Sequence, residues 1–402
     1  MNNLIRIIKK AIKNPRKACD VLIHNFLMVC LGMPPALLIL LLRPIVFVRI
    51  VEIQAHKLGD LVIRCDIYLS EKRLGRHRGF VDLFFLNGKP INKAVTNYFG
   101  TEMTWRRWLK WPFVALKKIA PNSGHLHLPR SGDIEGVLVT DQVNIPLSQD
   151  IIKRGDEWLA KFGVSPDDDV LLFANRDSVH LSTVLPDRDW SYHDYRDFPI
   201  DDMLPMVEVM TQKGYYAVRV GAHVAAPVET DNSRIIDYSS LGWSEEMDLY
   251  LGHRCKMMIS TTSGVVEIAR LFRKPIGYVN ASPFLTMTNI KTRRENFWCP
   301  KLYYSKHLGR CLTFQEIVDS GHGNTSKGHI LEDAGIELIN NTPEEIITLA
   351  EEMDASVNGR FSLGQEDETL IRRFYDILGG MTPEEGFAQI SAGFLRKHQS
   401  LL

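Results

Sequence analysis

The chain has few cysteines, and their spacing gives them neither a metal-binding nor a redox role. Six cysteines stand among 402 residues, with no C-x-x-C pair and no histidine cluster beside them. Most of them lie in apolar runs, which disfavours both a zinc site and a secreted disulfide framework. We therefore expect reduced, buried thiols in a cytoplasmic protein.

Net charge is absent as well. The 48 Lys and Arg residues balance the 48 Asp and Glu residues, which argues against a nucleic-acid-binding protein. The balance hides a gradient, because residues 1–165 carry a net charge of +12 and residues 166–402 carry −12. The basic part suits an anionic lipid surface, and the acidic part suits the cytoplasm.

The chain contains no low-complexity tract and no internal repeat. Hydrophobic residues make up 45% of it and charged residues 24%, which is typical of globular protein. A length of 402 residues predicts two to three domains.

The N-terminus carries the longest apolar run. A basic segment is followed by Val21 to Leu42, which is almost wholly apolar and is closed by Arg43. The run is too long for the core of a signal peptide and barely long enough to span a bilayer. Pro34-Pro35 predicts a sharp break, and cations on both flanks favour a helix that enters and returns to the cytoplasmic face. Residues 1–44 are thus expected to form a kinked monotopic membrane foot, with a full span and a buried core helix as alternatives.

A second stretch, residues 104–118, reads TWRRWLKWPFVALKK. Tryptophans interleaved with arginine and lysine are typical of a lipid headgroup interface. Single-stranded nucleic acid also stacks on such patterns, and an ordinary helix with core tryptophans would show the same letters. Beside the apolar foot, membrane contact is the better hypothesis.

Strands and helices are expected to alternate from residue 45 onward. Apolar and β-branched runs predict strands at 45–53, 80–86, 136–139, 170–174, 216–220, 235–236, 257–259 and 276–280. Helices are predicted between them, and two more, at about 366–380 and 383–398, follow. This alternation predicts parallel sheets covered on both faces.

The expected fold class is α/β, with two doubly wound, Rossmann-like domains that face a cleft. VSPDDD at 164–169, where the charge changes sign, has the composition of a linker. We therefore expect one domain at 45–165, a second at 166–345, and a tail of C-terminal helices at 346–402. In such folds ligands bind at the carboxyl ends of the strands.

The segment 256–280, KMMISTTSGVVEIARLFRKPIGYVN, is the most informative. It joins an apolar strand to a helix through Ser260, Thr261, Thr262, Ser263 and Gly264. Small hydroxyl residues and glycine let backbone N–H groups reach an anion, and a helix N-terminus adds partial positive charge. The loop is a candidate phosphate site, with a hydroxyl cap on an ordinary helix as the alternative. It is neither a Walker loop nor a G-x-G-x-x-G motif.

Three cations could contact the phosphate. Arg176 and Arg219 stand at the ends of predicted central strands, and Lys301 is a weaker candidate. Burying an arginine in such a place costs free energy unless its guanidinium is paired. A guanidinium can also bind a phosphate group through two parallel hydrogen bonds. The alternative is a structural ion pair, for instance with Asp177 or Asp237.

Segment 256–280 resembles the nucleotide-sugar site of two-domain, GT-B-fold glycosyltransferases, in which a hydroxyl-rich turn, a helix with a glutamate and a Lys-Pro pair precede a strand. The stretches AHKLGDLVIRCDIYL, NRDSVHL, YYAVRVGAHV and WCPKLYYS with CLTFQEI are similar to a family of bacterial surface-polysaccharide glycosyltransferases. This resemblance spans about residues 50–345. It implies that residues 260–264 hold the diphosphate of a nucleotide sugar and that Glu267 binds its ribose, with a solvated Glu267 as the alternative.

The resemblance also implies no cofactor and no bound metal. The aspartate runs 167–169 and 187–189 look like metal motifs, but we interpret both as solvated turns.

Leu58-Gly59-Asp60 resembles the first-loop Gly-Asp of heptosyltransferases, which implies Asp60 as the catalytic base. A carboxylate there would deprotonate an acceptor hydroxyl, and His56, with a pKa naturally near neutral, is the second candidate. The polysaccharide family often has histidine where this chain has Asp60. An N-cap on the following helix is a further alternative for Asp60.

Together these features predict a membrane-associated glycosyltransferase on the cytoplasmic face of a bacterial inner membrane. It would move a sugar from a nucleotide-sugar donor, bound by residues 166–345, to a lipid-linked or cell-envelope glycan on the side of residues 45–165. A nucleotide-sugar epimerase of the same fold and a non-catalytic membrane scaffold are the alternatives.

Overall fold

The computed structural model describes residues 15–179, 183, 191–288 and 290–402. The chain divides into two compact units. Unit 1 comprises Met1–Ile91 and Phe99–Arg130, and unit 2 comprises Asn92–Tyr98 and Ser131–Leu402. The division at Arg130 lies upstream of the domain change expected near residue 165.

Residues 131–165 belong to unit 2 because of the way helix α6 packs. Helix α6 (Gln149–Ala160) lies against α9 (Glu245–Arg254), and the hydroxyl of Tyr250 in α9 donates to Asp156 Oδ1 of α6 at 2.5 Å.

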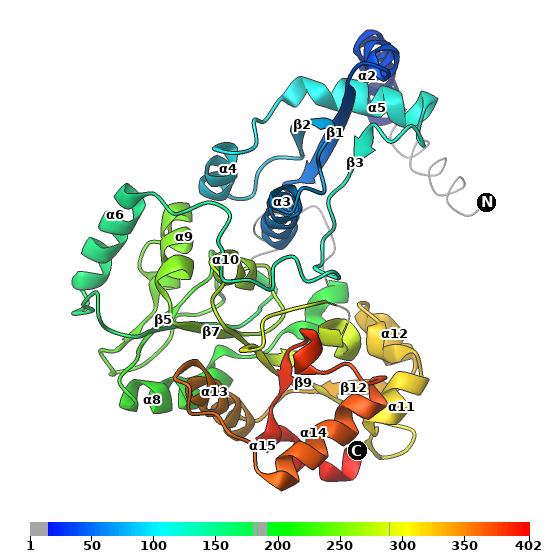
Figure 1. Ribbon diagram of the computed structural model, residues 1–402. Coiled ribbons are helices and arrows are strands. Elements are labelled where there is room, and N and C mark those ends of the chain that lie inside the picture. Colours follow the sequence, from blue (N-terminus) through cyan, green and yellow to red (C-terminus); the bar gives the residue numbers. More distant parts are fainter. Residues whose placement is uncertain (1–14, 180–182, 184–190, 289) are drawn as a thin grey trace. The chain divides into compact units, whose positions relative to one another are not determined.

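Unit 1 is built on a three-stranded parallel sheet in the order β2-β1-β3 (Figure 1). Strands β1 (Phe47–Gln54) and β2 (Phe80–Asn87) confirm the predicted strands at 45–53 and 80–86, while β3 (Leu126–His127) was not predicted. One face of the sheet packs against helices α2 (Pro15–Leu42) and α5 (Lys110–Ile119). The other face contacts α3 (Leu58–Arg73), where the Tyr68 hydroxyl donates to Asp82 Oδ2 at 2.5 Å. Helices therefore cover both faces, as expected of a parallel sheet.

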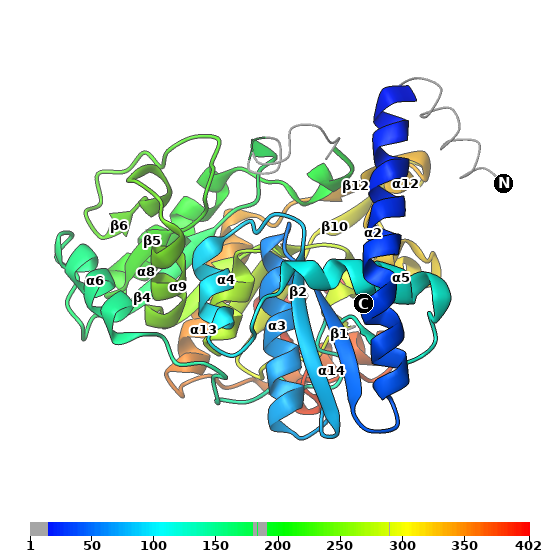
Figure 2. The same ribbon diagram turned by 90° about the horizontal axis from the view of Figure 1, so that it is seen from above.

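Helix α2 runs without a break through both prolines, as Figure 2 shows, so the sharp break predicted at Pro34-Pro35 was wrong. Each proline removes one helix hydrogen bond, but packing on α5 holds the helix on either side of them. Before the prolines, Gly32 lies so close that a Cβ there would stand 2.2 Å from the main-chain oxygen of Trp111. After them, Ala36 and Ile39 are buried in the apolar cluster shared with α5.

Only part of the predicted membrane foot lies within the described residues. Residues 1–14, with their basic side chains, lie outside the described residues. Among the residues that are described, no helix is long and apolar enough to cross a membrane.

The strand predicted at 136–139 was also wrong. The segment is a turn in which the backbone N–H groups of Val137 and Leu138 donate to the Asp133 carboxylate at 2.9 and 2.7 Å. A side chain that takes these donors leaves them unable to join a sheet ladder.

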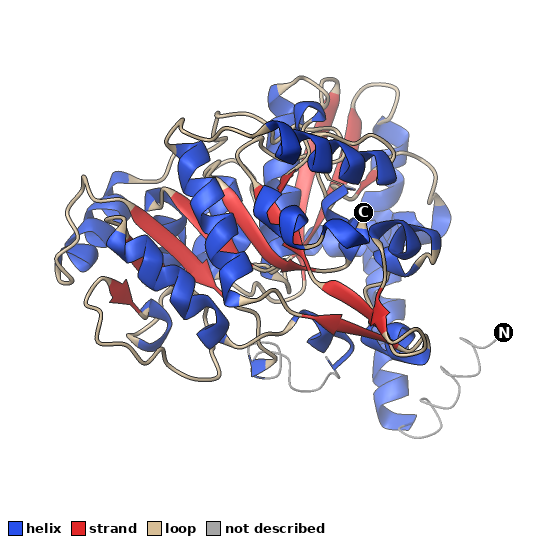
Figure 3. Cartoon of the chain, turned by 90° about the horizontal axis from the view of Figure 1, so that it is seen from below, coloured by secondary structure: helices blue, strands red, loops and turns tan. Residues whose placement is uncertain are grey.

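Unit 2 contains a seven-stranded sheet in the order β13-β9-β8-β7-β4-β5-β6, with every neighbouring pair parallel. Figure 3 draws the strands in red and the helices in blue. Its strands are β4 (Val170–Ala174), β5 (Tyr216–Arg219), β6 (Ile235–Ile236), β7 (Met257–Ser260), β8 (Ile276–Ala281), β9 (Phe297–Pro300) and β13 (Gln389–Ile390). Without β13, the strand order is that of a doubly wound sheet, which confirms the prediction for this half. The cleft expected between two such domains stays a prediction.

Shorter elements surround this sheet. The helices are α4 (Lys93–Gly100), α8 (Leu204–Gln212), α10 (Val266–Leu271), α11 (Phe314–Asp319), α12 (Gly328–Asp333), α13 (Pro343–Val357), α14 (Gln365–Ile377) and α15 (Ala392–Lys397). A small antiparallel sheet joins β10 (Leu302–Ser305) to β11 (Arg310–Cys311) and β12 (Ile336–Ile339). Short 3₁₀ helices include η2 (Ser191–Arg196) and η3 (Ile200–Met203).

The last segment of the chain is not the single helix predicted at 383–398. A short turn is followed by β13, which pairs with β9, and only then by α15. The backbone N–H groups of Gln389 and Ser391 donate to Asn296 and Trp298 at 2.7 and 3.0 Å. Pairing with a distant strand thus outweighs the local helical pattern, and the tail completes the sheet of unit 2.

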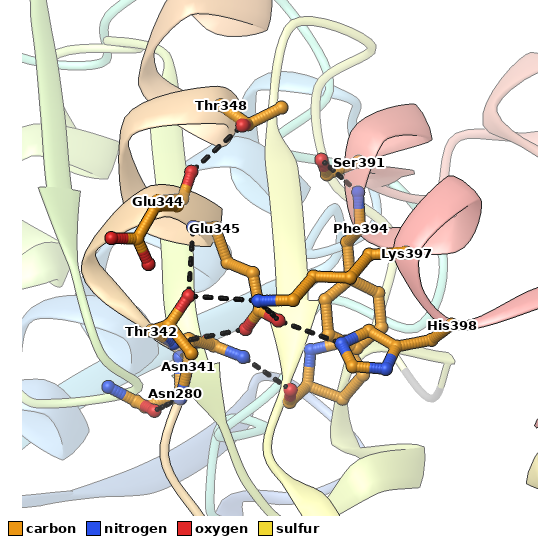
Figure 4. A network of polar contacts seen from close by, with 11 residues as sticks. Asn280, Asn341, Thr342, Glu344, Glu345, Thr348, Ser391, Phe394, Lys397 and His398 are labelled. Carbon is orange, nitrogen blue, oxygen red and sulfur yellow. Dashed lines mark hydrogen bonds and ion pairs between the residues drawn. The ribbon is translucent and has the colours of Figure 1, made fainter.

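The start of α13 anchors α15. Thr342 and Glu345 form a reciprocal capping box at the helix start. Glu345 Oε1 also accepts from Lys397 Nζ at 2.8 Å and from His398 Nε2 at 2.7 Å (Figure 4). A buried carboxylate therefore fastens the C-terminal helix to α13.

Candidate functional site

The strand order of the sheet in unit 2 indicates where a ligand would bind. Strands β4 and β7 are neighbours, yet the chain leaves β4 towards β5 on the other side, so the direction of winding reverses between β4 and β7. Ligands of doubly wound sheets bind at the carboxyl ends of the strands at such a point. Ala174, the last residue of β4, pairs with Ser260, the last residue of β7. The fold thus brings Arg176 and the loop 260–264 to one sheet edge.

The hydroxyl groups of this loop divide into two sets. Thr261 Oγ1 donates to the Asn280 main-chain oxygen at 3.3 Å, and Thr262 Oγ1 donates to that of Ser282 at 3.1 Å. Both threonines therefore tie the loop to the end of β8. Ser260 Oγ and Ser263 Oγ are buried and have no hydrogen-bond partner among the described residues.

None of these hydroxyls caps α10. The N-cap position is Val265, and it makes no side-chain cap bond. The alternative of a hydroxyl cap on an ordinary helix was therefore wrong. Gly264, the last residue of the loop, is exposed, and its lack of a side chain lets a ligand approach the backbone.

Arg176 and Lys301 share one loop as their partner. Arg176 forms an ion pair with Asp197, and Lys301 Nζ donates to the main-chain oxygens of Tyr195 and Asp197 at 2.8 and 3.2 Å. The Lys301 residue is only 3% exposed. The structural ion pair that formed the alternative for Arg176 is therefore present, with Asp197 as its partner. Asp177 instead accepts N–H groups from the loops after β4 and β5.

Burial lowers the pKa of both cations. Burial and the neighbouring Arg176 lower the pKa of Lys301 to about 8. Burial and the neighbouring Arg196 lower the pKa of Arg176 to about 10. Arg196 Nη1 in turn donates to the Thr262 main-chain oxygen at 3.3 Å, so the segment that holds the cations also contacts loop 260–264. An anion placed here would meet several positive charges at once.

Arg219 is placed differently. It is 1% exposed, its Nη1 donates to the Ala226 main-chain oxygen at 2.7 Å, and it lies 3.4 Å from Asp237 Oδ2. Asp237 Oδ2 also accepts the N–H of Val228 at 2.9 Å. The ion pair with Asp237 that formed the alternative is therefore present, and Arg219 fastens the loop after β5 to the end of β6.

Glu267 is not the solvated side chain considered as an alternative. Its Oε2 lies 3.3 Å from Arg270 Nη1, and both side chains are largely buried. Arg270 Nη2 also donates to the hydroxyl of Tyr278 in β8 at 2.5 Å. Glu267 is thus held at the start of α10, beside the loop 260–264.

A cavity of about 1180 Å³ adjoins Lys301. Lys301 and Asp197 line it together with residues of η2, β12 and α12. The volume exceeds that of ordinary small-molecule pockets, and it would accommodate a ligand of nucleotide size.

Asp60 and His56 lie at the carboxyl end of β1 in unit 1. Helix α3 begins at Leu58, so Asp60 is in its first turn, and the cap position is Lys57. The N-cap alternative for Asp60 was therefore wrong. Asp60 Oδ1 accepts from Arg64 Nε at 3.3 Å, and a carboxylate in the first turn also suits the helix dipole.

Unit 1 contains one further polar cluster that the sequence did not reveal. Ligand atoms of Glu71, His77 and His127 lie within 4.8 Å of one another, the kind of group that holds a metal ion. However, His77 Nδ1 lies 2.9 Å from Arg49 Nη2, which can only donate. The other ring nitrogen then carries the proton and faces Glu71 at 3.2 Å, which opposes metal binding.

The aspartate runs have separate outcomes. Asp168 Oδ2 accepts the Ser165 N–H at 2.7 Å and Asp169 pairs with Lys256 at 2.6 Å, so 167–169 is a turn as predicted. Residues 187–189 lie outside the described residues.

Sequence reasoning missed Asn280, which is wholly buried at the end of β8 with φ of 51°. Its N–H donates to Asn341 Oδ1 at 2.5 Å, and Asn341 N–H returns a bond to Asn280 Oδ1 at 2.6 Å (Figure 4). Asparagine tolerates this left-handed conformation better than most residues. An asparagine at a strand end was the available signal.

Comparison with known proteins finds only weak structural similarity at low sequence identity. No protein-family model and no curated protein matches the sequence. Among solved structures, the glycosyl transferase family 9 protein from Veillonella parvula DSM 2008 is similar with a TM-score of 0.45 and 12% identity, covering 76% of this chain and 96% of that one. The E. coli ADP-heptose LPS heptosyltransferase II is similar with a TM-score of 0.34 and 12% identity, covering 71% and 97%. Both scores are too low to carry an argument, so the fold assignment rests on the strand order.

Proposed function

We propose that this protein is a glycosyltransferase that binds a nucleotide-sugar donor on unit 2. The observation that carries the proposal is the pairing of Ala174 with Ser260, which puts Arg176 and the loop 260–264 at the switch point of a doubly wound sheet. The resemblance of segment 256–280 to nucleotide-sugar sites supports the same reading.

In the proposed reaction the leaving group is a nucleoside diphosphate. Arg176 and Lys301 would stabilise its developing negative charge, together with hydroxyl and N–H groups of loop 260–264, in place of a metal ion. Fixed positive groups in a buried site stabilise such charge more strongly than water does. Asp60, with His56 as the second candidate, would take the proton of the acceptor hydroxyl.

The first test is binding of UDP, GDP, ADP and CDP, followed by transfer from the matching nucleotide sugars. Arg176→Ala should lower the rate of transfer by about 100-fold, the usual effect of losing one charge-stabilising group. Arg154→Ala is the matched control, because Arg154 belongs to the same unit and its side chain is 56% exposed beside Glu246. Full transfer activity in Arg176→Ala would refute the site.

Incubation without acceptor separates the alternatives. Formation of an epimeric nucleotide sugar under those conditions would favour the epimerase. Failure of every nucleoside diphosphate to bind would favour the non-catalytic scaffold.

We also propose that unit 1 binds the cytoplasmic face of a bacterial inner membrane, where a lipid-linked or cell-envelope glycan would be the acceptor. The support is an apolar surface on α2, on α5 and on the short helix η1 (Arg107–Leu109) that precedes α5. The exposed apolar side chains are Ile23, Phe26, Leu27, Leu31, Leu37, Leu38, Leu41, Trp108 and Trp111. The basic side chains Arg43, Arg107, Lys117 and Lys118 are exposed on the same helices or next to them. Apolar side chains with tryptophan and flanking cations are the pattern that anionic lipid attracts.

Flotation with vesicles that contain an anionic phospholipid tests this surface. Leu38→Ser with Leu41→Ser should reduce the bound fraction, because both side chains are at least half exposed on α2. Leu241→Ser with Leu308→Ser is the matched control, since these leucines are similarly exposed on unit 2. Equal binding of both variants would contradict the proposed surface.

A further inference from the structure

The cavity of about 1180 Å³ beside Lys301 is a second candidate site in unit 2. Its walls are formed by η2, α12 and β12, and α12 packs against η2. Among the described residues that line it, none belongs to loop 260–264, and neither Arg176 nor Glu267 is one of them. Usual small-molecule pockets measure about 300–1,000 Å³, so this space is large enough for a chain of several small units.

Positive and negative side chains line this cavity nearly in balance. The cations are Lys301, Lys306 and Lys327, and the carboxylates are Asp194, Asp197, Glu332 and Glu337. Asp197 is already paired with Arg176. Glu337 is paired with Lys306, at 3.5 Å. A small anion would meet the remaining carboxylates, and a small cation would meet the remaining lysines. The lining therefore favours a ligand that offers many hydrogen bonds and little net charge.

The other polar groups of the lining can donate and accept hydrogen bonds. Asn340 offers a side-chain amide and His329 offers an imidazole. A sugar hydroxyl also donates one hydrogen bond and accepts two, so ammonium, carboxylate and amide groups can all bind it. Leu331 and Ile336 add apolar surface to the lining, on which the C–H face of a sugar ring can pack.

We infer that this cavity binds an oligosaccharide, at a site separate from the one proposed for the nucleotide sugar. The binding requires no nucleotide, so the inference goes beyond the proposed function and does not depend on it. In a glycosyltransferase such a site would hold a glycan chain on the enzyme between successive transfers.

The test begins with the full-length protein on a microarray of bacterial surface oligosaccharides. Calorimetry without nucleotide then measures the affinity for the oligosaccharide that is retained most strongly. Lys327→Ala with Glu332→Ala should weaken this binding by at least about tenfold, the usual value of one hydrogen bond to a charged group. Both residues are exposed, so the melting temperature should stay close to that of the wild type.

Lys213→Ala with Glu351→Ala is the matched control. These two residues are paired on the surface of unit 2 outside the cavity, and their side chains are 37% and 46% exposed. Each double variant loses one lysine and one glutamate, so the net charge is the same in both, and the control should bind the oligosaccharide as the wild type does. Retention of no oligosaccharide on the array, or equal affinities of the two double variants, would overturn the inference.

A saturating mixture of UDP, GDP, ADP and CDP separates this site from the donor site. The oligosaccharide should stay bound, because loop 260–264 is not among the described residues that line the cavity. Its displacement by the nucleotides would mean that the cavity belongs to the donor site, and this result would also overturn the inference.

Discussion

Lys301 Nζ donates a hydrogen bond to the main-chain oxygen of Tyr195 at 2.8 Å. A cation that follows β9 is thereby held by the same segment whose Asp197 pairs with Arg176. The two positive charges are buried near each other, and Arg176 lowers the pKa of Lys301.

Binding of a nucleoside diphosphate should weaken as the pH rises. Burial and Arg176 lower the pKa of Lys301 to about 8, so this cation is charged at about pH 7 and mostly neutral at about pH 9. Loss of one charge-assisted contact should weaken binding by about tenfold, measured by calorimetry across this range. In Lys301→Arg the dependence should disappear, because a guanidinium stays charged. Lys306, which lines the same cavity and is exposed beside Glu337, provides the control: Lys306→Arg should keep the wild-type pH profile.

Arg219→Ala should lower stability rather than act through the ligand. Removing one partner of a buried pair leaves Asp237 uncompensated, which costs about 3 kcal/mol of the free energy of unfolding. Urea unfolding measures this loss, and nucleotide affinity of the folded fraction should be unchanged. A stable variant that no longer binds nucleotide would show that Arg219 contacts the ligand.

The attachment of α15 to α13 should depend on acid pH. Burial alone would raise the pKa of Glu345, but hydrogen bonds from His398 and Lys397 lower it to about 2. Its contribution to stability is therefore fully present above about pH 4.5 and is lost as the pH falls through about 2. Glu345→Gln should reduce the free energy of unfolding by about 1–3 kcal/mol at neutral pH and flatten its acid dependence.

Glu316→Gln is the control for that variant. Glu316 belongs to a similar capping box, and its pKa is also lowered to about 2, chiefly by hydrogen bonds from Arg310 and Thr313, yet its side chain is 38% exposed, against 4% for Glu345. Because solvent screens its partners, the change should be smaller than for Glu345→Gln in the same urea titration. An equal effect of the two variants would mean that burial does not strengthen the contacts of Glu345 with Lys397 and His398.

Gly32→Leu should separate α2 from α5. Any Cβ at this position would stand 2.2 Å from the Trp111 main-chain oxygen, so the helices must move apart. We expect a lower melting temperature and altered tryptophan fluorescence. Gly364→Leu is the control, since the nearest side-chain atom would lie 3.8 Å from a Cβ there. Unchanged melting of Gly32→Leu would mean that the two helices are not packed as described.

Segments with strong local patterns were predictable from the sequence. The predicted strand 170–174 coincides with β4, and the helix predicted between the strands 235–236 and 257–259 is α9. An unbroken apolar run and a serine cap before an acidic first turn are local signals. Strands β9 to β13 were missed. They are two to four residues long. Strands β9, β12 and β13 form because strands distant in sequence supply their partners, whereas β11 pairs with the nearby β10.

The same distinction divides the candidate site. Loop 260–264 could be found because strand, loop and helix follow one another directly. The contacts of Arg176 and Lys301 with residues 195–197 could not, because they join segments up to 106 positions apart. The role of Arg219 was likewise decided by a partner on another strand, Asp237, which was one of two candidates in the sequence.

The packing of α2 on α5 also has a consequence for the order of synthesis. The face of α2 that carries Gly32, Ala36 and Ile39 is covered by a helix that begins only at Lys110. A growing chain therefore exposes this apolar face, as well as the one that stays open in the finished protein, until α5 has left the ribosome. During that interval the nascent helix is apolar on both sides, and it would need a chaperone or a bilayer to avoid aggregation.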